Sequence, residues 1–166
     1  DPHNAAAICR TCDALGVQDV WLVFENVKAW NPRRVGKGSS SSANKWLSFR
    51  TFKTTAECIA ALADEGYTSV GAVIGGSTEV GKAEFGEMQK VALWVGNEHR
   101  GLSAAAQSAA AVTVRFPMNG FVESLNVSVA TALVLYEVVR QREATDKDWK
   151  LDRSEAEMLA KNWAER

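Results

Sequence analysis

The sequence predicts an α/β domain in which a mostly parallel sheet is flanked by helices. Short apolar segments alternate with helical segments along the chain, which is the order typical of β–α–β units. The apolar segments are continuous rather than alternating, so their strands are expected to be buried on both faces. The chain has 166 residues, of which 46% are hydrophobic and 23% charged, and this is enough to bury one such core.

The first part of the chain is predicted to form a helix, a strand, a long loop and a second strand. Asn4 can cap a helix over 5–15, which Gly16 would terminate. The apolar run at 20–24 predicts a buried strand. Glycines, a proline and a run of serines then predict a loop, and the alternating segment 47–52 predicts the next strand.

The middle of the chain is predicted to form one helix and two further strands. Thr54 and Glu57 have the spacing of a capping box, which predicts the start of a helix that ends at Gly66. An apolar strand at 69–76 runs into a glycine turn. Another strand begins at Lys90 and ends in a second glycine-rich loop.

The last third of the chain is predicted to be mainly helical. Ser103 is expected to cap a short alanine-rich helix, and a strand follows at 111–118. The helix over 124–142 is apolar on nearly every side, which predicts that it is buried or lies in a dimer interface. After a charged linker, Ser154 and Glu157 form a second predicted capping box for a final helix.

Charge is unevenly distributed although the net charge is only −1. Positions 26–56 contain no Asp or Glu but seven basic residues: Lys28, Arg33, Arg34, Lys37, Lys45, Arg50 and Lys53. Acidic residues gather near the end of the chain instead. A local basic stretch attracts phosphate whatever the total charge, so the stretch is either an RNA-facing loop or a solvated surface.

Membrane, disulfide and metal classes are not favoured. No apolar run approaches the roughly 18 residues that span a bilayer, and the start lacks the pattern of a signal peptide. Three cysteines are too few for a secreted disulfide framework, so a reducing, cytoplasmic setting is expected. Cys9 and Cys12 could be a redox dithiol, half of a zinc site or packing residues of a helix. Three cysteines and two histidines without ligand spacing favour packing and no metal.

Three loops at predicted strand ends combine glycine with several polar residues. They are "GGSTEVG" (75–81), "GNEHRGLS" (96–103) and "PMNGFVESLNVS" (117–128). Ligands of parallel sheets bind at the carboxyl ends of the strands, so the chemistry is expected there. Neither a G-x-G-x-x-G pattern nor a P-loop is present. Ser124 can be read as the N-cap of the next helix and Asn126 as a donor in its first turn, or both can be read as polar groups that meet a ligand.

Three separated motifs resemble those of the SpoU family of SPOUT-class ribose 2′-O-methyltransferases. They are "HNAAAICRTCDALG" (3–16), "LWVGNEHRGLS" (93–103) and "FPMNGFVESLNVSVATALVLYE" (116–137), in the order and spacing of the family. Within the family, the chain most resembles the tRNA (guanosine-18) 2′-O-methyltransferases, through "NKWLSF", "YEVVRQR" and a final helix with Trp163. Alternatives are an rRNA ribose methyltransferase of the same family and a non-catalytic RNA-binding knot protein.

The resemblance implies a C-terminal deep trefoil knot whose loops bind S-adenosylmethionine. It assigns the cofactor to the following positions: Ala72, Val73, Ile74, Gly96, Phe116, Met118, Leu125 and Asn126. It also implies the catalytic residues Arg10, Asn4, Glu98, Ser124 and Asn126. A guanidinium keeps its proton in proteins, so Arg10 is expected to position phosphate and stabilise alkoxide charge rather than act as a base. The proton acceptor is left open.

The resemblance also implies partners and a domain division. RNA is expected to contact Arg33, Arg34, Lys37, Arg140 and Arg142. A homodimer is expected, with the long helix in its interface. The catalytic domain would span 1–142, and a linker and helix would occupy 143–166.

Overall fold

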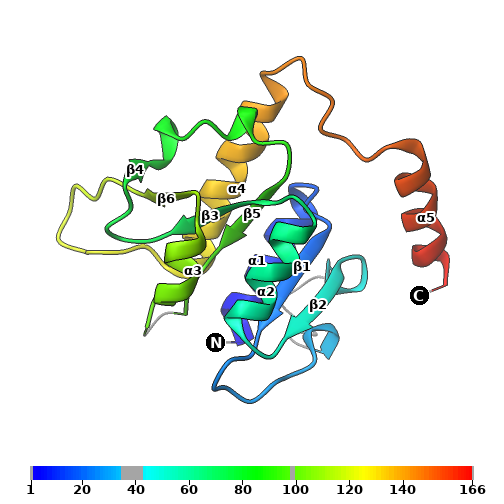
Figure 1. Ribbon diagram of the computed structural model, residues 1–166, viewed down its shortest axis with the longest axis horizontal. Helices are drawn as coiled ribbons and strands as arrows, with labels where there is room; N and C mark the ends of the chain where they lie inside the picture. Colours follow the sequence, from blue (N-terminus) through cyan, green and yellow to red (C-terminus); the bar gives the residue numbers. More distant parts are fainter. Residues whose placement is uncertain (1, 35–42, 98–99, 166) are drawn as a thin grey trace.

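The computed structural model describes residues 2–34, 43–97 and 100–165, in which helices cover both faces of two sheets (Figure 1). The helices are α1 (Pro2–Ala14), α2 (Thr55–Asp64), α3 (Ala104–Ala109), α4 (Val127–Glu143) and α5 (Arg153–Ala164). The strands are β1 (Asp19–Val23), β2 (Ser48–Phe52), β3 (Thr68–Ala72), β4 (Thr78–Glu79), β5 (Val91–Trp94) and β6 (Val112–Arg115). Short 3-10 helices lie at Pro32–Arg34 (η1), Ala43–Lys45 (η2), Val80–Lys82 (η3) and Phe85–Glu87 (η4).

The strands of the described residues pair in parallel, as predicted, but they form two sheets rather than one. β1 pairs with β2, and the second sheet has the order β4-β6-β3-β5. The register places Val70 of β3 between Leu93 of β5 and Val112 of β6. β3 is therefore a central strand, and its apolar sequence follows from burial on both faces.

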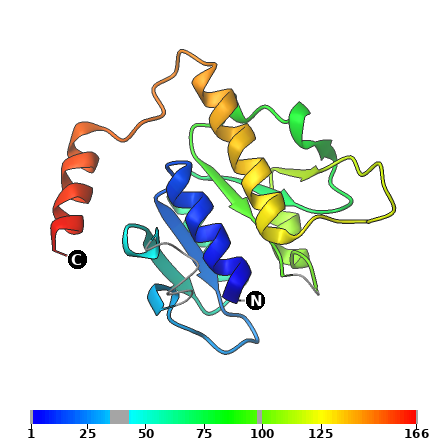
Figure 2. The same ribbon diagram turned by 180° about the vertical axis from the view of Figure 1, so that it is seen from behind.

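Helices α1 and α4 lie side by side over one face of the sheets, whereas α2 and α3 lie on the opposite face (Figures 1 and 2). One core cluster joins α4 to β3 and β6, and its buried residues are Val70, Ala83, Phe85, Val114, Val134 and Val138. A second cluster joins α1 to α4 and contains Cys9, Cys12, Leu47 and Leu135. Burial of these side chains is the main force that holds the layers together.

Several predicted helix ends are confirmed. Thr54 accepts from the Glu57 backbone N–H at 3.2 Å, and the Glu57 carboxylate accepts from the Thr54 N–H at 3.2 Å, which completes the capping box of α2. Ser103 caps α3 by accepting from Ala106 N at 3.3 Å. Gly16 and Gly66 follow α1 and α2 with a φ of 73°, a conformation that favours glycine.

Three predicted helix starts are wrong in detail. α1 begins at Pro2, so Asn4 lies inside the helix and is not its cap. α4 begins at Val127, with Asn126 rather than Ser124 as its N-cap. α5 is capped by Asp152 with Glu155, because the Asp152 carboxylate accepts both from Glu155 N and from the hydroxyl of Ser154, each at 2.8 Å.

α5 stands apart from the two sheets (Figure 1). Trp163 packs edge-on against Trp46 with ring centroids 6.1 Å apart, and its indole N–H donates to the Trp46 carbonyl at 2.8 Å. None of the described residues of α5 is buried. Within the described ranges, no helix combines the length and the apolar character that crossing a bilayer requires.

Candidate active site

The three loops singled out in the sequence follow neighbouring strands. β6, β3 and β5 are adjacent and parallel, so their carboxyl ends meet at one edge of the sheet. The loops that leave this edge run through 73–77, 95–103 and 116–126. The three loops in which the sequence predicts a ligand site therefore leave the sheet at the same edge.

Asn126 connects this edge to the first helix. Its side-chain oxygen accepts from Ser128 N at 2.8 Å and from the Ser128 hydroxyl at 2.6 Å, which caps α4. Its amide nitrogen donates to Asn4 Oδ1 at 3.0 Å. One side chain thus fixes the start of α4 and binds α1 to it, and two predicted catalytic residues lie in direct contact.

Arg10 projects from the exposed side of α1, six residues or about 1.7 turns beyond Asn4. Together with His3, Ala7, Thr11 and Ala14 it lines an open hollow of about 470 Å³ on that helix. Small alanines beside the guanidinium leave space for a large ligand such as a nucleotide. Arg10 forms no ion pair with another described residue, so its charge remains available for a phosphate or an alkoxide.

The loop after β5 requires glycine at position 96. A Cβ atom built on Gly96 would lie 2.0 Å from the Gly101 carbonyl carbon and 2.2 Å from Leu102 N. The loop closes through a bridge between Asn97 and Gly101, in which Gly101 N donates to Asn97 O at 2.9 Å. Glu98, which is predicted to be catalytic, and its neighbour His99 lie outside the described residues.

The other predicted cofactor positions surround the same edge. Ala72 ends β3, and Val73 N donates to Val114 O at 3.0 Å, which holds the start of the next loop against β6. Ile74 then turns outward and is 69% exposed. Phe116 packs against the core, whereas Met118 and Leu125 are half-buried. The predicted cofactor positions therefore place apolar side chains along this edge of the sheet.

The loop between β6 and α4 has unpaired backbone groups. In the described part of the chain, no residue from Met118 to Leu125 makes a backbone hydrogen bond to another residue. Unpaired N–H and C=O groups next to apolar side chains suit a ligand with an apolar body and a polar edge. Adenine and a methionyl chain have this character, so these residues fit S-adenosylmethionine. Ser124 is exposed in this loop.

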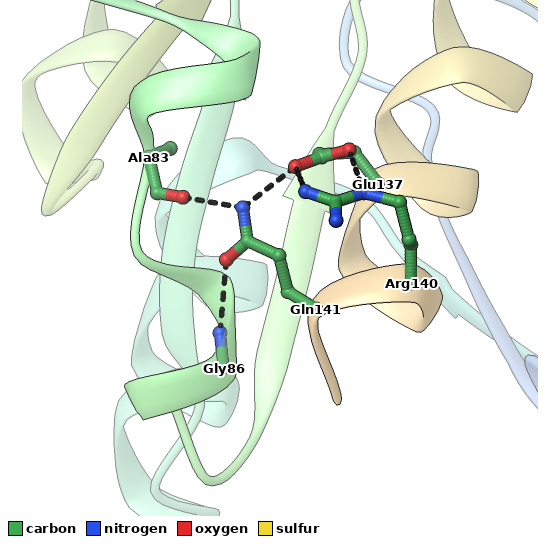
Figure 3. A network of polar contacts seen from close by, with 5 residues as sticks. All are labelled: Ala83, Gly86, Glu137, Arg140 and Gln141. Carbon is green, nitrogen blue, oxygen red and sulfur yellow. Dashed lines mark hydrogen bonds and ion pairs between the residues drawn. The ribbon is translucent and has the colours of Figure 1, made fainter. Parts of the chain in front are cut away.

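Arg140, predicted to contact RNA, is paired within α4. Its Nε and Nη2 donate to Glu137 at 2.8 and 2.6 Å, and this hydrogen-bonded pairing lowers the pKa of Glu137. Gln141 extends the network, since its Nε2 donates to Ala83 O at 2.8 Å and its Oε1 accepts from Gly86 N at 3.2 Å (Figure 3). The Arg140 side chain is still 53% exposed, so it can meet a phosphate from its open side.

Arg142, the second basic residue predicted at this end, has a more buried role. Its Nη2 donates to the carbonyls of Met88 and Gln89, both at 3.2 Å, and burial lowers its pKa. Arg142 therefore holds the last turn of α4 against the segment after η4. Of the other predicted RNA contacts, Arg33 is exposed, with its guanidinium 5.8 Å from the Phe49 ring centroid. The side chain of Arg34 and all of Lys37 lie outside the described residues.

The cysteines of the first motif are packing residues. Cys9 and Cys12 are buried in the cluster between α1 and α4, with Leu47 and Leu135. Burial raises the pKa of Cys9, and it raises the pKa of Cys12 to about 12. Both are thiols rather than reactive thiolates at neutral pH. No group of metal-ligating side chains occurs among the residues that the structure describes.

Two features of the site were missed by sequence reasoning. Asn4 was expected to begin a helix, and its contact with Asn126 spans too great a sequence separation for any local pattern to reveal. The Gln141 network was also missed, because a glutamine on a helix face normally indicates only a solvated position. The polar pair Glu137 and Gln141, one turn apart on an apolar helix, was the available signal.

The sequence is similar to proteins of one known family. The sequence model of the SpoU rRNA Methylase family matches residues 1–136. The chain is 33% identical to the tRNA (guanosine(18)-2′-O)-methyltransferase of Escherichia coli over 142 residues, which make up 86% of this chain and 60% of that relative. The chain thus spans less than two thirds of the length of this relative.

Solved structures of similar fold include two methyl-transfer or tRNA-modifying proteins. The TrmH/SpoU tRNA modifying enzyme of A. aeolicus is 28% identical, with a TM-score of 0.84 over 99% of this chain and 83% of that one. The SpoU methyltransferase AviRb of Streptomyces viridochromogenes, solved with its cofactor AdoMet, is 28% identical with a TM-score of 0.76 over 87% of this chain and 58% of that one.

Proposed function

Because the chain belongs to the SpoU methylase family, we propose that it transfers the methyl group of S-adenosylmethionine to a ribose 2′-hydroxyl of tRNA. The observation that carries this proposal is the bond between the first and third motifs, near the strand ends from which the loop of the second motif leaves. Asn126 of the third motif donates to Asn4 of the first at 3.0 Å, and the glycine loop of the second motif begins at the end of the neighbouring strand β5. Guanosine 18 in the D-loop is the proposed target, since it is named for the Escherichia coli relative.

The cofactor would lie along the edge formed by the ends of β3, β5 and β6. When bound, S-adenosylmethionine supplies a methyl group on a positively charged sulfonium sulfur, and this sulfur is a good leaving group because it departs as a neutral thioether. The open backbone groups of 118–125 would recognise its polar edge, and the apolar side chains of Val73, Ile74, Met118 and Leu125 would cover its apolar parts. Gly96 keeps the facing loop folded tightly enough to leave this space.

The chain contributes position and charge to the reaction. The ribose 2′-oxygen must be held about 3 Å from the methyl carbon and in line with the bond that breaks. Methyl transfer would form the oxygen–carbon bond, leave the cofactor as a neutral thioether and release the hydroxyl proton to solvent. Arg10, exposed and without an ion pair among the described residues, would hold the neighbouring phosphate and stabilise charge on the oxygen. Ser124, Asn126 and Glu98 would orient the ribose or Arg10.

We extend the proposal to the finer fold and to the assembly. The family resemblance supports a trefoil knot formed by the C-terminal segment, with a catalytic part over 1–142 and an appended linker and helix over 143–166. A homodimer is supported by α4, whose Val129, Leu133 and Tyr136 are 46%, 44% and 58% exposed at the spacing of one helix face. An apolar stripe of this kind is stabilised by a partner. A cytoplasmic location suits an enzyme that acts on tRNA.

A methyl-transfer assay with unmodified transcripts tests the function directly. Labelled S-adenosylmethionine would be incubated with the protein and either a tRNA transcript or large-subunit rRNA fragments, and the methylated ribose would be mapped. We expect incorporation into tRNA at guanosine 18. Incorporation into rRNA alone would move the substrate to the rRNA alternative, and absence of transfer with retained RNA binding would support the non-catalytic alternative.

A further inference from the structure

The loop between β1 and η1 presents a tryptophan to solvent. Trp30 is 39% exposed although it is one of the largest apolar side chains of the protein. Its indole packs nearly perpendicular to Phe24, with ring centroids 5.6 Å apart and an interplanar angle of 81°. Phe24 N in turn donates to Phe52 O at 2.9 Å, which continues the parallel pairing of β1 and β2. Trp30 is therefore held against the end of the sheet while part of its surface remains in water.

Hydrogen bonds fix the chain directly after Trp30. The Asn31 side chain accepts from Arg33 N at 3.0 Å. Asn44, which is buried in η2, donates to the carbonyls of Pro32 and Arg33 at 3.4 and 3.0 Å. These bonds tie η1 to η2, and they limit the number of orientations open to the neighbouring Trp30. A surface ring held in this way loses little conformational entropy when a flat partner stacks on it.

The charges around Trp30 are positive. Lys28 and Arg33 flank it in sequence and are exposed, and neither forms an ion pair with another residue in the described ranges. The nearby carboxylate of Glu25 is engaged, because it accepts from both the backbone N–H and the hydroxyl of Thr55 at the start of α2. The surface of the Lys28–Arg33 segment thus combines one aromatic ring with two available cations.

This segment lies at the same end of the molecule as the start of α1. Figures 1 and 2 both show the loop that follows β1 next to the N-terminal end of that helix. The antiparallel course of α1 and β1 explains the placement. The same helix carries Arg10, so an RNA held by Arg10 can extend toward Trp30.

We propose that Trp30 stacks on an unpaired base of the RNA substrate while Lys28 and Arg33 contact the adjoining phosphates. This inference rests on the proposed function and names a recognition surface for it. A ring beside cations is the combination that binds single-stranded nucleic acid, since every base offers a flat face and every linkage a negative charge. An apolar protein partner would gain nothing from two cations that form no ion pair within the described residues, so RNA is the occupant that the surface fits.

Substitution of Trp30 separates stacking from charge. Binding of an unmodified tRNA transcript would be measured for the wild type, Trp30→Ala and Trp30→Phe at several salt concentrations. We expect Trp30→Ala to weaken binding roughly 5- to 150-fold without altering the slope of log Kd against log salt. Trp30→Phe should restore most of the affinity. Lys28→Gln should instead lower that slope by about one unit.

The chain offers a matched control in Trp149. It is 36% exposed, close to the value for Trp30, but it lies in the linker before the final helix, where acidic and basic residues alternate (Asp148, Lys150, Asp152, Arg153) instead of in a segment that holds only cations. Trp149→Ala should leave tRNA affinity unchanged. A blunt RNA duplex of similar length provides the second control, because it offers no unpaired internal base and should bind wild type and Trp30→Ala equally.

Three outcomes decide the inference. If wild type binds and methylates tRNA but Trp30→Ala binds as tightly, the stacking surface is wrong and the proposed function stands. If Trp30→Ala loses as much affinity for the duplex as for tRNA, the ring is not a base-stacking platform. If wild type binds no RNA, both the function and the inference fail. Should Trp30→Ala fold poorly, quenching of tryptophan fluorescence by tRNA in wild type, reduced in Trp30→Phe, carries the same test.

Discussion

Arg10 is an exposed cation on a helix face whose other members are small or polar, and this setting defines its expected contribution. Removing one preorganised positive group from a developing oxyanion typically costs about 10²–10³ in kcat. We expect Arg10→Ala to lower kcat for tRNA methylation by at least that factor, whereas the affinity for S-adenosylmethionine measured by calorimetry stays unchanged.

Arg10→Lys is the informative companion variant. It keeps the charge but loses the planar fork that binds phosphate in two places, so an intermediate kcat is expected. Equal losses of cofactor affinity and of kcat in Arg10→Ala would contradict the assigned role, because they would place Arg10 in the cofactor site or in the fold.

Cys12 makes the stability depend on pH in the alkaline range. Burial raises its pKa from 9.0 to about 12, whereas the unfolded thiol ionises near its ordinary value. The unfolded state therefore loses the proton first as pH rises. The stabilisation is complete below about pH 8.5 and is lost progressively up to about pH 12, at no more than about 1.4 kcal/mol per pH unit.

Chemical denaturation of wild type and Cys12→Ala at pH 7.5, 9 and 10 measures this effect. The variant has a lower free energy of unfolding at every pH, because truncation leaves a cavity in the cluster with Leu47 and Leu135. Its decline between pH 9 and 10 should nevertheless be shallower than that of wild type. Parallel declines would show that the Cys12 thiol is not shielded from water in the folded protein.

At the scale of secondary structure, the start of α4 combines two roles in Asn126. Its oxygen caps the helix and its amide nitrogen binds Asn4 of α1. Serine is nearly as good an N-cap as asparagine, but it is too short to reach Asn4. We expect Asn126→Ser to keep the thermal midpoint within a few degrees of wild type and to lower methyl transfer at least tenfold.

Asn126→Ala is the comparison for that variant. Loss of the cap costs about 1 kcal/mol, so its thermal midpoint should fall further than that of Asn126→Ser while its activity is equally low. If Asn126→Ser methylates tRNA at the wild-type rate, the contact with Asn4 has no part in arranging the site.

The sequence predicts elements well where the controlling interactions are local. The capping box of Thr54 and Glu57 and the cap at Ser103 are satisfied within four residues, and both predictions are confirmed. At α5, two overlapping patterns compete, and Asp152 prevails over Ser154 as the cap. The pairing of β4 with β6 depends on residues about 36 apart, such as Thr78 and Val114, and no short-range pattern specifies it.

At the scale of the whole molecule, the exposed apolar stripe of α4 predicts self-association. Leu133 is 44% exposed at the centre of the stripe, so a carboxylate there would be buried against a partner in the dimer. We expect Leu133→Glu to sediment as a monomer at micromolar concentration, where wild type sediments as a dimer. Met158→Glu, at a 62% exposed position on α5, serves as the control and should remain dimeric.

The architecture could be predicted only in outline. Apolar strands between helices predict a parallel α/β fold, because burial on both faces leaves its mark on every strand. The sequence does not show that β1 and β2 form a sheet of their own, because the same apolar strands would suit one continuous sheet or two separate sheets. The candidate site was located through motif residues at strand ends, whereas the contact between Asn4 and Asn126 required the folded chain.

The bond between Asn4 and Asn126 joins residues 122 positions apart, and this has a consequence during synthesis. A ribosome that adds about 5–20 residues per second needs roughly 6–24 s to travel between them. Throughout that interval α1 has no α4 to pack against, and Cys9 and Cys12 lack the cover of Leu135. Until α4 is in place, these thiols lack part of the burial that raises their pKa in the finished protein, so they ionise closer to the ordinary cysteine value.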